Sequence, residues 1–310
     1  MSNKTAFVFP GQGSQSVGML ADFSESDIEV QQTFEEASES LGYDLWQKVK
    51  EGPAEELNKT EITQPAILTA GVAVWKIWQK KSEERPQVMA GHSLGEYTAL
   101  VCGGAIAFAD AVKLVETRGR LMQKAVPAGQ GLMAAVLGLD DEKVKEICSQ
   151  AAEGQVVSAV NFNAPGQVVI AGNKEAVERA CSRLKENGAR RAQPLAVSVP
   201  SHCSLMKGAA EELKQTLNSI KIDLPQIPVI HNYNVEVSTS ADAIVDSLVK
   251  QLYCPVRWVE TVQKIADDGA ERMVECGPGK VLVGLNKRIV KGVPTLPVFD
   301  NASLEKACVN

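Results

Sequence analysis

The stretch Val88-Met89-Ala90-Gly91-His92-Ser93-Leu94-Gly95-Glu96 decides how the rest of the chain is interpreted. A short apolar run ends at Gly91, a Gly-x-Ser-x-Gly sequence follows, and helix-forming residues then resume. This order is typical of a nucleophile elbow, in which a strand, a tight turn and a helix present a serine. A Cβ at Gly91 or Gly95 would collide with the crowded backbone of such a turn. The pattern therefore predicts a reactive Ser93, with positive potential from the helix N-terminus and the Leu94 N–H.

Two simpler interpretations of these residues stay open. The match can arise by chance, or Ser93 can cap the following helix without reacting. The apolar strand before the motif and the helix after it favour the nucleophile.

Composition indicates a globular protein with a substantial core. The chain has 310 residues, of which 45% are hydrophobic, enough for one large domain with an elaboration. The net charge of −6 argues against general nucleic-acid binding, which needs a basic surface. No apolar run is long enough to span a bilayer, and residues 1–4 lack the form of a signal peptide. Seven cysteines without a Cys-x-x-Cys pair indicate free thiols and no zinc site, so we expect a soluble cytoplasmic protein without metal.

The order of predicted strands and helices divides the chain into a large and a small unit. In the large unit we predict strands over 5–9 and 274–276 and helices over 26–41, 65–81, 96–102, 110–125 and 242–253. In the small unit we predict strand 132–137, helix 141–152, strands 156–161 and 167–171, helix 174–187 and strand 192–199. That β-α-β-β-α-β order is the order of a ferredoxin-like unit. We therefore expect an α/β protein with subdomains over 1–127 plus 200–310 and over 128–199, with Pro127 and Pro200 near the hinges.

A glycine-rich loop, Gly11-Gln12-Gly13-Ser14-Gln15, follows the first predicted strand. It has neither the spacing of a dinucleotide-binding turn nor the Lys-Ser/Thr pair of a P-loop, so nucleotide binding is not favoured. The flanking glycines would let the Gln12 side chain reach into a cleft. A plain surface turn is the alternative.

Arg118 is the second informative position. At about 100° per residue it falls at the centre of an apolar helical stripe formed by Ala111, Leu114, Val115, Leu121, Met122 and Ala125. A buried guanidinium is costly unless it meets an anion. That anion could be an internal Asp or Glu, which would make Arg118 structural. Beside a nucleophilic serine, a substrate carboxylate is the better candidate.

The chain has three histidines, so the search for a general base is short. His92 adjoins Ser93, but neighbouring residues on such a turn project in different directions. His202 lies on a proline-fixed loop at a subdomain junction, where clefts form, and it follows the serine in the chain order of an α/β-hydrolase. We favour His202 as the base, with His231, at the end of a predicted strand, in reserve. A structural histidine is the alternative.

Lys287, Arg288 and Lys291 form a basic cluster in an otherwise acidic chain. Such a cluster is usually a solvated face. Here it could also attract an acidic partner.

Five separated motifs resemble those of one protein family. They are Phe9-Pro10-Gly11-Gln12-Gly13-Ser14-Gln15, Gly91-His92-Ser93-Leu94-Gly95-Glu96, Arg118-Gly119, Val199-Pro200-Ser201-His202 and Glu275-Cys276-Gly277-Pro278-Gly279. In this order they resemble the malonyl-CoA:acyl carrier protein transacylases, and the resemblance covers nearly the whole chain. It is close to the stand-alone bacterial enzymes of type II fatty-acid synthesis. Five motifs in register are far more specific than a lone Gly-x-Ser-x-Gly.

The resemblance implies a fold and a set of roles. The fold is an α/β-hydrolase-like large subdomain with an inserted ferredoxin-like (βαββαβ) subdomain, which agrees with the pattern of predicted elements. The implied roles are Ser93 as nucleophile and His202 as base, with Gln12 and the Leu94 N–H as the oxyanion hole. Arg118 would hold the malonyl carboxylate.

The resemblance also bears on the residues around the histidine. In the family a backbone carbonyl orients it, and that carbonyl maps to Gln251. This would explain why no third acid stands out, although Asp140 and Asp141 lie between the serine and the histidine in sequence. Members of the family carry asparagine at the position of His231, a departure that affects the local polar network.

The implied activity is ping-pong transfer of a malonyl group from malonyl-CoA to the phosphopantetheine thiol of acyl carrier protein, with no metal or redox cofactor. One alternative is a serine esterase or thioesterase of α/β-hydrolase type, in which water takes the acyl group. Another is a non-catalytic module that binds acyl-CoA or the carrier protein. The absent third acid and the buried Arg118 argue against the hydrolase. The intact Ser93 and His202 argue against the binding module.

Overall fold

The central strand of the large unit is β1 (Thr5–Phe9), in a computed structural model that describes residues 4–197 and 199–309. β1 belongs to a five-stranded parallel sheet with the order β7-β2-β1-β8-β9. The other strands are β2 (Val88–Gly91), β7 (Val229–Ile230), β8 (Arg272–Cys276) and β9 (Thr295–Val298). Every residue of β1 is buried, as expected of a strand covered on both faces.

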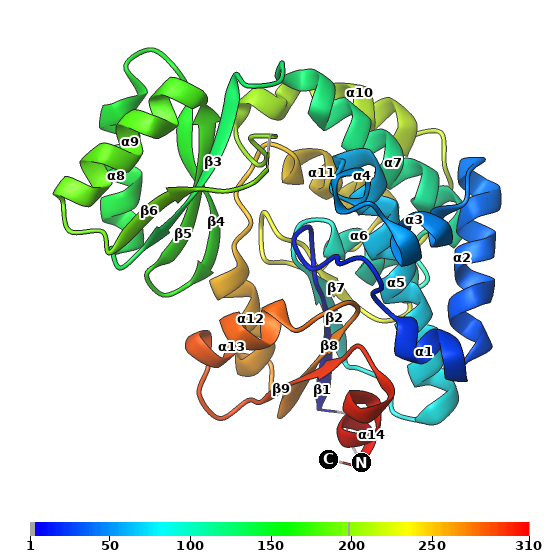
Figure 1. Ribbon diagram of the computed structural model, residues 1–310. Coiled ribbons are helices and arrows are strands. Elements are labelled where there is room, and N and C mark those ends of the chain that lie inside the picture. Colours follow the sequence, from blue (N-terminus) through cyan, green and yellow to red (C-terminus); the bar gives the residue numbers. More distant parts are fainter. Residues whose placement is uncertain (1–3, 198, 310) are drawn as a thin grey trace.

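Helices surround this sheet on both sides (Figure 1). They are α1 (Ala21–Ser26), α2 (Ile28–Leu41), α3 (Leu45–Glu51), α4 (Ala54–Leu57), α5 (Thr60–Lys81), α6 (Gly95–Cys102), α7 (Phe108–Ala125), the 3₁₀ helix η1 (Ser204–Met206), α10 (Lys207–Leu217), α11 (Ala241–Gln251), α12 (Trp258–Asp267), α13 (Val281–Ile289) and α14 (Asn301–Val309). In the described part of the chain, none of the helices combines the length and apolarity needed to cross a bilayer.

Alternate side chains of β1 enter different cores. Phe7 meets Trp75 and Trp78 of α5 edge-on, with ring centroids 5.2 and 5.1 Å apart. Ala6 and Val8 instead pack with residues of α12 and α13 on the opposite face. The period of two along the strand thus divides its side chains between the two helical layers. Both tryptophans are buried core residues.

A second sheet forms a separate lobe, at the upper left of Figure 1. It is antiparallel with the order β4-β5-β3-β6, and one face is covered by two helices. Its elements are β3 (Gly131–Leu137), α8 (Asp141–Ala152), β4 (Val157–Ala164), β5 (Gln167–Asn173), α9 (Lys174–Glu186) and β6 (Arg191–Pro194). The β-α-β-β-α-β order and this strand arrangement confirm the predicted ferredoxin-like unit.

Several predicted boundaries are wrong by two or more residues, and three of them have a local cause. The first long helix begins at Ile28 because the Asp27 side chain caps it by accepting from the Glu29 N–H at 3.1 Å. Helix α5 begins at Thr60, five residues before Pro65, so this proline lies within the helix and does not start it. The strand predicted over 192–199 ends at Pro194, which cannot donate to the ladder. Ser198, in that predicted strand, lies outside the described residues.

The turn between β2 and α6 is as crowded as its two glycines indicate. An added Cβ at Gly91 would lie 1.9 Å from the carbonyl carbon of Gly95. At Gly95 it would lie 2.1 Å from the carbonyl oxygen of Phe9 in β1. Both neighbours are backbone atoms of buried elements, so neither can move aside without shifting a strand or helix. The sheet and α6 can approach this closely only with glycine at both positions.

We predict that Gly91→Ala lowers the free energy of unfolding by about 3 kcal/mol or more, because backbone atoms on both sides must separate. Denaturant unfolding followed by circular dichroism would measure the change. The matched control is Gly284→Ala in α13, where nothing lies within 4 Å of the added Cβ. That variant should be neutral or stabilising by up to about 1 kcal/mol, as helix propensity dictates. Equal stability of the two variants would contradict the steric argument.

Candidate active site

Ser93 occupies the sharpest point of the turn between β2 and α6. Its φ is 52°, a left-handed conformation that is strained for a residue other than glycine. The Asn232 side chain fixes this turn from both sides. Its Oδ1 accepts from the Ser93 N–H at 2.7 Å, and its Nδ2 donates to the Gly91 carbonyl at 2.6 Å. The serine therefore projects from a conformation held by strand, helix and asparagine together.

His202 contacts Ser93 directly. Its Nε2 lies 2.8 Å from Ser93 Oγ, and its Nδ1 lies 2.7 Å from the backbone carbonyl oxygen of Gln251. A carbonyl only accepts, so Nδ1 carries the proton and the Nε2 lone pair faces the serine hydroxyl. This tautomer is the one that a general base needs. His202 also has a left-handed backbone, with φ of 62°, and its N–H donates to the Leu252 carbonyl.

The surroundings of His202 keep its imidazole neutral. Only 3% of the residue is exposed. Burial and the nearby positive charge of Arg118 lower the pKa of His202 to about 3, although the hydrogen bond to the Gln251 carbonyl opposes the shift. At neutral pH the side chain is thus free to accept a proton.

Arg118 lies on the same side of the serine and is 1% exposed. Its Nη1 donates to Gln64 Oε1 at 2.8 Å, and its Nη2 donates to Gln251 Oε1 at 3.0 Å. A longer contact of 3.4 Å joins Nη2 to Ser93 Oγ. These three acceptors are two amides and a hydroxyl, so the structure does not support the internal ion pair that the sequence left open. The guanidinium also lies over the ring of Tyr97, 5.2 Å from its centroid.

These side chains meet in a cavity of about 110 Å³. Gln12, Ser93, Leu94, Arg118 and His202 all line it, and Gln251 lies immediately behind. Among the described residues, no acceptor is found for the Leu94 N–H, which lies at the N-terminus of α6. The structure therefore brings together all six residues to which the sequence analysis assigned a role in the site. Further lining comes from apolar side chains of the small unit and the segment after it, namely Met133, Val169, Leu195, Val197 and Val199.

The other two histidines have partners of their own. His92 Nε2 lies 2.8 Å from Asn163 Oδ1, and its ring packs against Trp258. His231 Nδ1 lies 2.7 Å from Glu96 Oε1, and its Nε2 lies 2.7 Å from Ser238 Oγ. Neither contacts Ser93 Oγ, so the geometry favours His202 for the role of base. Asp140, one of the two acids considered as a third member, instead caps α8 in the small unit.

Sequence reasoning missed three residues of the site. Asn232 holds the serine turn, Gln64 holds Arg118, and Glu96 accepts from the Gln251 side chain at 2.9 Å. All three are fully buried polar residues. Gln64 lies just before the helix predicted over 65–81, so no apolar stripe marked it as a buried residue. In the described part of the chain, no group of three His, Cys, Asp or Glu side chains is arranged to hold a metal ion.

The fold and the site together define a class of protein. A serine at a strand–turn–helix elbow, paired with a histidine from a later loop, sits on a parallel α/β sheet of the hydrolase-like type. The chain belongs to the acyl transferase family, whose domain model matches residues 6–300. It is therefore an acyltransferase.

Similar proteins are known in bacteria. A malonyl CoA-acyl carrier protein transacylase from Haemophilus influenzae is 60% identical, over 97% of this chain and 96% of the relative. The crystal structure of an acyl carrier protein S-malonyltransferase from Vibrio cholerae is 59% identical, with a TM-score of 0.96 over 98% of this chain and 99% of the other. A malonyl-transacylase solved in complex with a type II polyketide synthase acyl carrier protein is 57% identical, with a TM-score of 0.98 over 99% of both chains.

We predict that Ser93 keeps its reactivity at unusually low pH. A fluorophosphonate probe should modify it at a rate that stays flat from about pH 8 to about pH 5, because His202 remains unprotonated far below the ordinary histidine pKa of about 6.5. Intact-mass time courses would give the rates. A rate that falls with a midpoint near pH 6.5 would show that burial and Arg118 do not depress the pKa.

Proposed function

We propose that this chain transfers a malonyl group from malonyl-CoA to the phosphopantetheine thiol of acyl carrier protein, through a malonyl-serine at Ser93. It thereby supplies malonyl-acyl carrier protein for fatty-acid biosynthesis. The observation that carries the proposal is the combination of the Ser93–His202 contact at 2.8 Å with a buried arginine whose hydrogen-bond partners are uncharged. The names of the relatives agree with it.

In the first half-reaction, Ser93 Oγ attacks the thioester carbonyl carbon while its proton moves to His202 Nε2. The charge that develops on the carbonyl oxygen is stabilised by the Leu94 N–H and by Gln12. The carbon–sulfur bond then breaks, and the coenzyme A sulfur takes the proton from His202. The position of both residues on the cavity wall supports these roles, as does the Leu94 N–H, which has no acceptor among the described residues.

The second half-reaction follows the same path in reverse. The pantetheine thiol gives its proton to His202 and attacks the malonyl-serine carbonyl. When the carbon–oxygen bond breaks, Ser93 regains the proton from His202. Throughout both steps the Gln251 carbonyl holds the imidazole in one tautomer.

Arg118 gives the reaction its acyl preference in this proposal. A planar guanidinium can form two parallel N–H···O bonds with the malonyl carboxylate, and acetyl offers no such group. The rival function, a serine esterase or thioesterase, would leave this buried cation without a purpose, and the names of the relatives do not favour it.

We predict that malonyl-CoA alone adds one malonyl group to the wild-type chain and none to Ser93→Ala, as seen by intact mass. Adding acyl carrier protein should then move the label to the carrier thiol. Release of free malonate at the rate of acyl-enzyme breakdown would instead identify a hydrolase. Labelling that persists in Ser93→Ala would refute the nucleophile.

We also propose that the subdomains span 1–127 plus 200–310 and 128–199. The position of β3 to β6 between Gly131 and Pro194 supports these boundaries. We further infer that the enzyme acts in the cytoplasm. All seven cysteines are free thiols, which suits a reducing compartment.

The acidic carrier protein is proposed to dock near the C-terminal end of α13. Lys287 and Lys291 are exposed there, and Arg288 binds the Pro165 carbonyl of the β4–β5 turn at 3.0 Å. Arg288 is thus engaged within the chain, which leaves the two lysines as the better candidates for an intermolecular contact.

We predict that Lys287→Glu with Lys291→Glu raises the apparent KM for carrier protein severalfold at low salt and less at high salt, because exposed charges are screened. The KM for malonyl-CoA should not change. Lys50→Glu with Lys81→Glu, at exposed positions of α3 and α5, serves as a control with the same change in net charge. An unchanged carrier KM at low salt would place the docking surface elsewhere.

A further inference from the structure

The guanidinium of Arg118 is held by two neutral amides. Gln64 Oε1 accepts from Nη1, and Gln251 Oε1 accepts from Nη2. Among the described residues, Nε has no hydrogen-bond partner although it is buried. The guanidinium is therefore fixed in place while keeping its positive charge and at least one unused donor.

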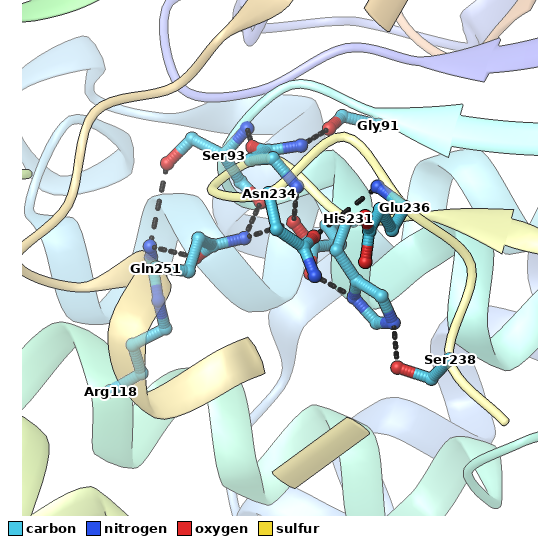
Figure 2. Close-up of polar contacts among 10 residues, drawn as sticks. Gly91, Ser93, Arg118, His231, Asn234, Glu236, Ser238 and Gln251 are labelled. Carbon is cyan, nitrogen blue, oxygen red and sulfur yellow. Dashed lines mark hydrogen bonds and ion pairs between the residues drawn. The ribbon is translucent and has the colours of Figure 1, made fainter. Parts of the chain in front are cut away.

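A buried carboxylate lies close by but is engaged elsewhere. The oxygens of Glu96 accept from His231 Nδ1, the Asn232 N–H and Gln251 Nε2, at 2.7 to 2.9 Å. Figure 2 shows Gln251 between Arg118 and this group of hydrogen bonds. Its Nε2 also donates to the Ser93 carbonyl, so its side-chain oxygen must face Arg118. An amide thus separates the negative charge from the positive one.

Gln64 faces Arg118 from the opposite direction. It lies in the second turn of α5 and is fully buried. Its Nε2 is directed at the Met122 sulfur at 3.5 Å, a weak acceptor, so the oxygen is the atom left for the guanidinium. A glutamate would fit the same space and would form a direct ion pair with Arg118. The chain instead has the uncharged residue of the same shape.

We propose that Gln64 is a specificity-determining residue that positions Arg118 without neutralising it. The substrate carboxylate is then the first full counter-ion that the guanidinium meets. This inference rests on the proposed malonyl transfer and deepens it, because it assigns the preference for a carboxylated acyl group to a residue that need not touch the substrate.

A substrate carboxylate would meet different charges in the native site and in a site with glutamate at position 64. In the native site it enters beside an uncompensated cation whose solvation has already been lost, so the new ion pair is strongly favoured. With glutamate at position 64 the cation would already be paired. The substrate would then bring a second negative charge to one guanidinium. An acyl group without a carboxylate would neither gain the ion pair in the native site nor meet the negative charge of the glutamate as repulsion in the variant.

The test compares kcat/KM for malonyl-CoA and acetyl-CoA in Gln64→Glu, with acyl transfer to acyl carrier protein as the assay. We expect malonyl transfer to fall by about 100-fold or more and acetyl transfer to change by less than about threefold. The melting temperature should stay level or rise, because an internal ion pair replaces an unpaired charge. A fall in the malonyl-to-acetyl ratio of kcat/KM at an undiminished melting temperature is a result that a merely structural glutamine would not give.

Gln64→Met provides the matched variant of similar size without charge or hydrogen bond. It should lower malonyl transfer by about tenfold and acetyl transfer less, since the guanidinium keeps its charge but loses one anchor. If Gln64→Glu does not fold, Gln64→Met still decides, because a structural role predicts equal losses for both substrates. An unaltered malonyl-to-acetyl ratio in the folded variants overturns the inference. Failure of the wild-type chain to transfer malonyl would instead overturn the proposed function.

Discussion

The close crossing of β2 and α6 constrains every other part of the site. The backbones of these elements approach so nearly that no side chain fits at Gly91 or Gly95. The chain between them must therefore turn sharply, and Ser93 takes a left-handed conformation that projects its hydroxyl outward. The same crossing brings the Leu94 N–H to the start of the helix, where no described residue accepts a hydrogen bond from it. Asn232 binds across the turn and offsets part of the strain by satisfying the buried backbone groups.

Burial acts on two basic side chains in this site and affects them differently. Desolvation disfavours the charged form of both His202 and Arg118, and the positive charge of Arg118 lowers the pKa of His202 further. Arginine keeps its proton because its intrinsic pKa is far above neutrality, so histidine loses its own. The result is a neutral base next to a permanent cation. In the proposed reaction, a substrate carboxylate would pair with that cation and so reduce the cost of protonating His202 during acyl transfer.

The sequence predicted those features that depend on local pattern. The glycine spacing predicted the elbow, the helical stripe predicted a buried Arg118, and the order of elements predicted the ferredoxin-like unit. Contacts between distant segments left no comparable signal. Asn232 reaches the Ser93 amide from 139 positions away, and Gln64 lies 54 positions from Arg118. Element boundaries failed where side-chain capping or proline chemistry decided them, as at Asp27 and Pro194.

Gln251 contacts His202, Arg118 and Ser93, whose relative positions must be maintained in the proposed reaction. Its backbone carbonyl accepts from His202 Nδ1, and its side-chain oxygen accepts from Arg118. The amide nitrogen of the same side chain donates to the Ser93 carbonyl. Because this residue ends α11, its backbone carbonyl also lies at the negative end of a helix, which favours donation by the imidazole N–H. A neutral carbonyl orients the histidine but stabilises an imidazolium less than a carboxylate would. The proton on His202 is therefore held weakly, which suits a base that must return it to a sulfur or an oxygen in each half-reaction.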